Sequence, residues 1–77
     1  MVKVISEEER IRRLVEGSID TFITKGKMSH NWVISEIRTS GIKKEALRKL
    51  FSESYARNPS NVQLRELEKE CKERGFL

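Results

Sequence analysis

The chain has 77 residues, of which 36% are hydrophobic and 36% are charged, and its formal net charge is +4. A chain of this length forms one domain at most, so we expect residues 1–77 to be a single helical domain. A single cysteine excludes an internal disulfide and fits a cytoplasmic location. No apolar run approaches the ~20 residues of a membrane span, so we expect no membrane partner.

The first predicted helix covers roughly residues 7–25. Ser6 and Glu9 have the spacing of a capping box, and Gly26 is a natural stop after the last turn. Apolar residues recur along it at spacings of three and four, which predicts one buried face. They are Ile11, Leu14, Val15, Ile19, Phe22 and Ile23. Residues 1–5 are expected to be a frayed tail or, as a sharper hypothesis, part of a dimer-forming ribbon.

The next two predicted helices meet at a single glycine, Gly41. Ser29 is the expected cap of the earlier helix, which runs to about Ser40. Gly41 then takes the left-handed conformation, and Ile42 folds back onto Ile37 as in a Schellman ending. A tight turn between two helices is one way in which small proteins present a basic helix to DNA.

The third predicted helix, residues 43–57, lies in the segment that carries the basic excess. Residues 25–57 hold eight basic and three acidic groups, for a local charge of +5. Such an excess favours polyanions, nucleic acid first, through counterion release, although a solvated lysine-rich helix explains the pattern equally well. The candidate nucleic-acid contacts are Arg38, Lys43, Lys44, Arg48, Lys49 and Arg57.

The fourth predicted helix follows the break at Asn58 and Pro59. Ser60, with Gln63 three residues later, is the expected cap. A narrow apolar stripe runs along this helix, and Gly75 is the expected stop, with Phe76 packing back. The stripe consists of Leu64, Leu67 and Cys71. Because it is thin, residues 58–77 are expected to pack less tightly, to sit on a partner chain or to extend away from the body.

Trp32 lies outside the apolar cluster of the second predicted helix, near Glu36 on a helical wheel. Either this short helix is wedged between neighbours and buries two sides, or Trp32 is partly exposed and anchors a partner. The second option gives an alternative function. The chain would be a protein-binding adaptor or inhibitor, with a homodimer as one form, using Trp32 and the C-terminal helix.

The residue types do not form a catalytic, metal or cofactor pattern. His30 is the single histidine and Cys71 the single cysteine, so the clustered ligands that a metal site needs are missing from the sequence. A glycine-rich phosphate loop is also missing. We therefore expect no enzyme activity and no cofactor.

The segment from Ser29 to Phe51 resembles the helix-turn-helix of small bacterial regulators. The matching positions are Gly41, Ile42, Leu47 and Leu50. It departs from that motif at Glu36 and Ser40, where apolar side chains are usual, and at Ile37, where a small residue is usual.

The chain is also similar to the three-helix repeats of the RecX family, regulators of recombinase filaments. The positions that carry this similarity are Ser29, Val33, Ile37, Gly41, Ile42, Ala46 and Leu50. From the spacing of the apolar residues and the helix caps, the expected fold is all-α, a small bundle of three to four helices with a helix-turn-helix-like pair. The expected function is that of a non-enzymatic nucleic-acid-associated regulator that binds DNA through the basic helix at about 43–57.

Overall fold

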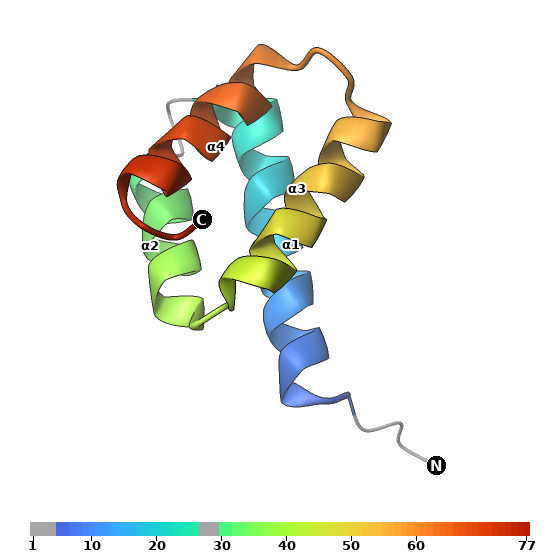
Figure 1. Ribbon diagram of the computed structural model, residues 1–77, viewed down its shortest axis with the longest axis vertical. Helices are drawn as coiled ribbons and strands as arrows, with labels where there is room; N and C mark the ends of the chain where they lie inside the picture. Colours follow the sequence, from blue (N-terminus) through green and yellow to red (C-terminus); the bar gives the residue numbers. More distant parts are fainter. Residues whose placement is uncertain (1–4, 27–29) are drawn as a thin grey trace.

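The computed structural model describes residues 5–26 and 30–77, and within them the chain forms four α-helices and no strand (Figure 1). The helices are α1 (Glu7–Lys25), α2 (His30–Ser40), α3 (Lys44–Arg57) and α4 (Val62–Glu73). The all-α prediction is confirmed. The expected cap at Ser29 and the tail or ribbon at residues 1–4 lie outside the described residues. Among the helices described, none combines the length and hydropathy that a membrane span requires.

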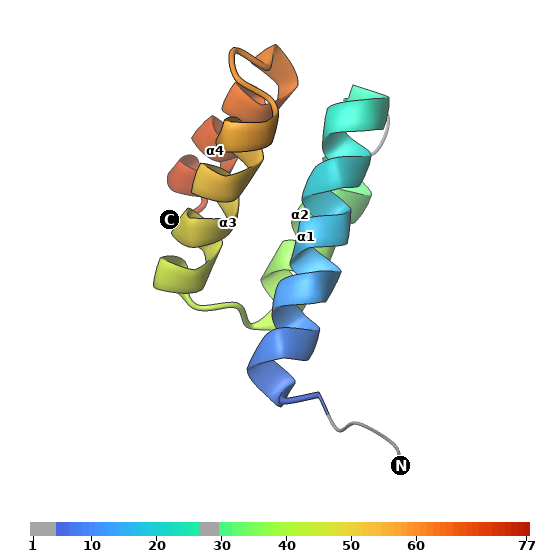
Figure 2. The same ribbon diagram turned by 90° about the vertical axis from the view of Figure 1, so that its right-hand side faces the viewer.

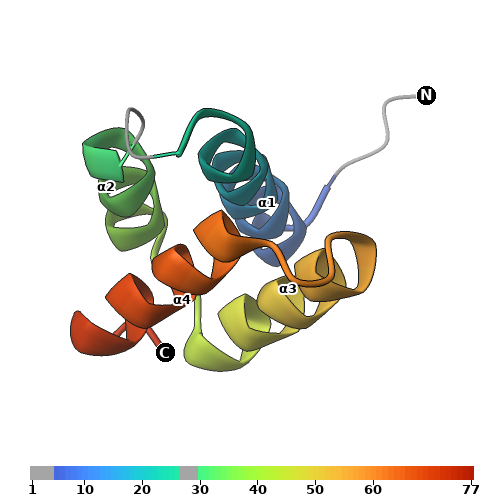
Figure 3. The same cartoon turned by 90° about the horizontal axis from the view of Figure 1, so that it is seen from above.

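The four helices form two layers. Seen from above, α1 and α2 lie side by side in one layer and α3 and α4 in the other (Figure 3), and the same division is visible in Figure 2. α1 contacts each of the other three helices, and its contact with α2 is the most extensive. α2 and α3 lie diagonally opposite each other (Figure 3), and each packs more extensively against α1 than against the other.

The core lies between the layers and draws three buried apolar side chains from every helix. These residues are Val15, Ile19, Phe22, Val33, Ile34, Ile37, Leu47, Leu50, Phe51, Leu64, Leu67 and Cys71. The three from α4 are 0% exposed, and α4 packs against α1 and α3. The expectation that this helix extends away from the body is therefore wrong. The three residues of its narrow stripe are enough to bury one side of α4 against α1 and α3.

One residue of the predicted apolar face of α1 points outward. Leu14 is 44% exposed, whereas Ser18 is 1% exposed. The buried arc is centred near Val15 and Phe22, and at about 100° per residue Leu14 falls at its edge. Ser18 tolerates burial because its hydroxyl donates to the Leu14 carbonyl at 3.2 Å.

The N-termini of α1 and α4 are both capped by a side chain. Ser6 Oγ accepts the Glu9 amide at 3.2 Å, as the sequence predicts. At α4 the predicted cap, Ser60, is wrong. Asn61 Oδ1 accepts the Leu64 amide at 2.9 Å, and Ser60 is a turn residue with a φ of 66°. Because Ser60 is in the left-handed region, where an N-cap residue is not found, the cap is one position later.

The C-terminus of α4 closes as a Schellman motif. Gly75 has a φ of 81°, its amide donates to the Lys72 carbonyl at 3.2 Å, and the Phe76 amide donates to the Cys71 carbonyl at 2.8 Å. Phe76 packs against the core. This closure turns the last residues back toward α2 and α3.

Candidate nucleic-acid interface

The turn between α2 and α3 is closed by a serine side chain. Gly41 has a φ of 72°, as expected for a left-handed stop. The Ile42 amide donates to Ser40 Oγ at 3.2 Å, and the Ser40 hydroxyl donates to the Ile37 carbonyl at 2.7 Å. The Ser40 hydroxyl thus relays the bond that a Schellman ending makes directly between these two residues. The turn brings Arg38, at the end of α2, near Lys43, at the start of α3.

Three of the predicted contact residues line one hollow. Arg38, Lys43 and Lys44 surround a space of about 450 Å³ between the α2–α3 turn and the end of α4. Its other lining residues are Ile37, Gly41, Ile42, Gly75 and Phe76. We call this the turn hollow. The turn hollow thus combines three cations with apolar side chains, and its lining residues include no acidic side chain.

A second basic hollow lies between α3 and α4. Arg48 of α3 and Lys72 of α4 line it together with Phe51, Ser52, Tyr55, Glu68 and Leu77, and its volume is about 430 Å³. We call this the α3–α4 hollow. The sequence does not predict Lys72 as a contact, because only the packing of α4 on α3 brings it to Arg48.

Tyr55 and Glu68 join the two helices at the α3–α4 hollow. The Tyr55 hydroxyl donates to Glu68 Oε1 at 2.9 Å. Burial, and then this hydrogen bond, raise the pKa of Tyr55 to about 12, so the phenol remains a protonated donor at neutral pH. The bond ties the ring to α4 and uses one oxygen of Glu68, the one acidic side chain in the lining of this hollow.

The remaining two predicted contacts, Lys49 and Arg57, line neither hollow. On a helical wheel Lys49 is on the side of α3 opposite the buried Leu47, and Arg57 points toward the α1 side. Arg57 is also about 20 Å along the helix axis from Lys44, at 1.5 Å per residue. The structure therefore brings together four of the six predicted residues and separates these two.

All six predicted cations are exposed, and none lies within 4.0 Å of a carboxylate among the described residues; the same holds for Lys72. The arginines of α1 differ in this respect. Arg12 pairs with Glu9 at 2.6 Å and Glu16 at 3.0 Å, and Arg13 pairs with Glu9 at 3.2 Å. The charge of the α1 arginines is thus paired within the helix, whereas that of the cations around the α2–α3 turn is not.

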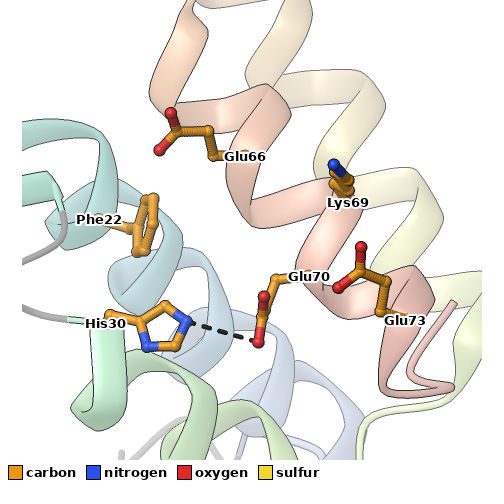
Figure 4. A pocket seen from close by; sticks show the side chains of 6 residues that line it. All are labelled: Phe22, His30, Glu66, Lys69, Glu70 and Glu73. Carbon is orange, nitrogen blue, oxygen red and sulfur yellow. Dashed lines mark ion pairs between the residues drawn. The ribbon is translucent and has the colours of Figure 1, made fainter.

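An acidic hollow lies on the other side of α4, facing α1 and α2 (Figure 4). Its lining residues are Phe22, His30, Glu66, Lys69, Glu70 and Glu73. His30 Nε2 lies 3.5 Å from Glu70 Oε1, and Arg74 Nε lies 2.6 Å from the same oxygen. The hydrogen bond from Arg74 is the main reason that the pKa of Glu70 is lowered. Within the described part of the chain, no three potential ligands form a metal site.

Trp32 is 51% exposed on the outer side of α2, away from the buried Val33 and Ile37. The hypothesis that α2 is wedged between neighbouring helices and buries two sides is therefore wrong. α2 buries one side only, because a single neighbour, α1, provides most of its contact.

Comparison of the chain with models of protein families, with curated proteins and with solved structures finds no match. The resemblances to helix-turn-helix regulators and to RecX-family repeats accordingly stay predictions from the sequence.

Proposed function

We propose that this chain is a non-enzymatic, cytoplasmic regulatory protein that binds nucleic acid, DNA first, through the surface around the α2–α3 turn and α3. The observation that carries the proposal is the contrast in pairing. Arg38, Lys43, Lys44 and Arg48 are exposed without a carboxylate within 4.0 Å among the described residues, whereas the α1 arginines pair with glutamates.

Unpaired cations bind phosphates by releasing counterions, and this term supplies most of the affinity of sequence-independent binding. A cation already paired with a carboxylate has less to gain, because it must first give up that partner. The support beneath the surface is also suitable. α3 rests on α1 and α4, so its cations are held by a packed element and not by a loose loop.

The test is a titration of a labelled duplex with the protein at several salt concentrations. For the double variant Lys44→Ala/Arg48→Ala we expect the slope of log K against log salt to become shallower by about 2, because the variant can no longer neutralise two of the phosphates. At about 0.1 M salt the affinity should fall roughly ten- to hundred-fold.

The matched control is Arg10→Ala/Arg13→Ala, which removes the same charge from exposed arginines paired with Glu7 and Glu9. Its effect on affinity should be much smaller. An equal decrease in affinity for the two double variants would mean that net charge alone matters, and binding that does not depend on salt would refute the proposal.

The exposure of Trp32 supports a second candidate function, that of a protein-binding adaptor or inhibitor, with a homodimer as one form. The apolar stripe of α4 is not available for this role, because it is buried. Val62, at the start of α4, is 63% exposed and remains a candidate contact. Tryptophan emission recorded in the same titrations separates the two functions. An adaptor shows a blue shift with rising protein concentration or on addition of a protein partner, and a nucleic-acid binder using α3 does not.

A further inference from the structure

We infer that the ligand of this surface is a single-stranded nucleic acid that lies along the α3–α4 hollow and the adjoining turn hollow. This inference rests on the proposed function and names its ligand class. Lys44 and Arg48 lie on the side of α3 that faces α4 and not on the side farthest from the core, and this placement favours a single strand over a duplex.

A helix that reads a duplex enters the major groove with its outermost side. On α3 that side, opposite the buried Leu47, carries Glu45, Lys49 and Ala56. One cation beside one carboxylate is a poor match for two rows of phosphates. The side of α3 with the better match is the one that faces α4.

The cations facing α4 line hollows and do not form a ridge. Arg48 from α3 and Lys72 from α4 line the same hollow together with Glu68 of α4, so each helix contributes one cation and the two cations outnumber the one acidic side chain. Lys44 is one turn before Arg48, about 6 Å along the axis, and lines the turn hollow. The consecutive residues Phe76 and Leu77 also line one hollow each, so the two hollows are neighbours on the surface and together offer a basic track to one strand.

Each hollow also has an aromatic residue that is partly buried. Tyr55 lines the α3–α4 hollow beside Arg48, and its hydrogen bond to Glu68 holds the ring in place. Phe76 lines the turn hollow. Cations that follow the backbone and aromatic rings on which bases stack are the two components of single-strand binding. The bases of a duplex are paired and cannot reach such rings.

The charge on the far side of α4 confines the strand. Glu66, Glu70 and Glu73 line the acidic hollow between α4 and the α1–α2 layer (Figure 4). A polyanion is repelled from this side, so the strand is expected to stay on the α3 side of α4.

The experiment measures fluorescence anisotropy with labelled oligonucleotides of about 12 nucleotides. Four probes are used: single-stranded DNA, single-stranded RNA of the same sequence, the DNA duplex, and an abasic DNA strand of the same length. We expect either natural single strand to bind at least about ten-fold more tightly than the duplex and the abasic strand, because base stacking on a ring has that magnitude. The comparison of DNA with RNA identifies the sugar.

Two variants test the residues. Lys72→Ala should weaken single-strand binding and make its salt slope shallower by about 0.7, the value for one neutralised phosphate on a single strand. The control is Lys69→Ala, which removes the same charge from the same helix on the acidic side and should leave the slope unchanged. Tyr55→Leu should weaken binding roughly five- to hundred-fold, whereas Tyr55→Phe keeps the ring and should retain most of it. Circular dichroism of each variant confirms that it is folded.

The outcomes separate the two proposals. Tighter duplex binding that still depends on Lys44 and Arg48 overturns the single-strand inference and leaves the proposed function standing. Equal binding of the abasic and natural strands also overturns it, because the bases would then play no part. If no probe binds in a salt-dependent manner, both proposals fail.

Discussion

Cys71 is a packing residue of α4 and not a reactive one. It is 0% exposed, and burial raises the pKa of its thiol to about 12. The thiolate is the nucleophilic and metal-binding form, so the neutral thiol behaves as a small apolar group in the same core that Phe76 packs against. A cysteine can serve as a nucleophile or a metal ligand, but at this buried position Cys71 serves in packing.

At the residue scale, Asn61 decides where α4 begins, and a pair of single substitutions tests this. Asn61→Ala removes the acceptor for the Leu64 amide and should reduce the free energy of unfolding by about 1 kcal/mol. Ser60→Ala, at the neighbouring turn position, should change it by less than about 0.5 kcal/mol. Urea denaturation of both variants gives the comparison. A larger decrease for Ser60→Ala than for Asn61→Ala would contradict this capping arrangement.

At the scale of elements, α1 and α3 use their charges in different ways. On α1, Arg12 donates to Glu9 and Glu16, and these i,i+3 and i,i+4 pairs support the helix itself. On α3, Lys44 and Arg48 lie on the side facing α4 and line hollows instead. Both helices are strongly charged in sequence, so only the pairing distinguishes a structural use of charge from an available surface.

The ion pairs of α1 predict how the protein responds to acid. The hydrogen bond from Arg12 is the main cause that lowers the pKa of Glu9 from 4.5 to about 2. A carboxylate whose pKa is lower in the folded state stabilises the fold above its unfolded pKa, and this contribution disappears as the pH falls through the folded pKa. We therefore expect the melting temperature to fall between about pH 5 and pH 2.

Glu9→Gln should reduce this fall, because the titrating group is gone. Glu8→Gln is the matched control, since Glu8 is in the same turn and forms no ion pair among the described residues. Thermal melts monitored by circular dichroism over this pH range give the result. Identical pH profiles for the wild type and Glu9→Gln would show that the pair does not persist in solution.

At the scale of the whole molecule, all four helices share one core, and α4 is part of it. Leu64 and Leu67 are 0% exposed and lie in the same buried cluster as residues of α1, α2 and α3. A chain of this length has roughly 4–12 kcal/mol of total stability, so any one core leucine accounts for a large share. The hollows on either side of α4 depend on this docking.

A pair of leucine substitutions tests the shared core. Leu67→Ala should cost about 2–5 kcal/mol, because it leaves a cavity, whereas Leu14→Ala, at a side chain 44% exposed, should cost less than about 1 kcal/mol. Unfolding is followed by circular dichroism and by the emission of Trp32 in α2. The two transitions should coincide if α4 and α2 unfold together. Separate transitions would show that the four helices do not unfold as one unit.

Much of the local structure can be predicted from residue patterns. The third helix is expected at 43–57 and is found at Lys44–Arg57, and Gly26, Gly41 and Gly75 end the elements that precede them. Two predictions fail: the cap of α4 is Asn61 and not Ser60, and Leu14 is exposed although it is expected on the buried face. The first depends on the backbone conformation of the turn and the second on where the centre of the buried arc lies, and neither can be obtained from spacing alone.

What the sequence determined by itself is the helical class, the approximate ends of the helices and the concentration of positive charge near the middle of the chain. These properties depend on neighbours within a few residues, through capping, periodicity and composition. Tertiary structure alone decided that Lys72 joins Arg48, that His30 meets Glu70 and that Trp32 faces outward. Each of these depends on how one helix is rotated against another, and that rotation is set by the packing of the whole core.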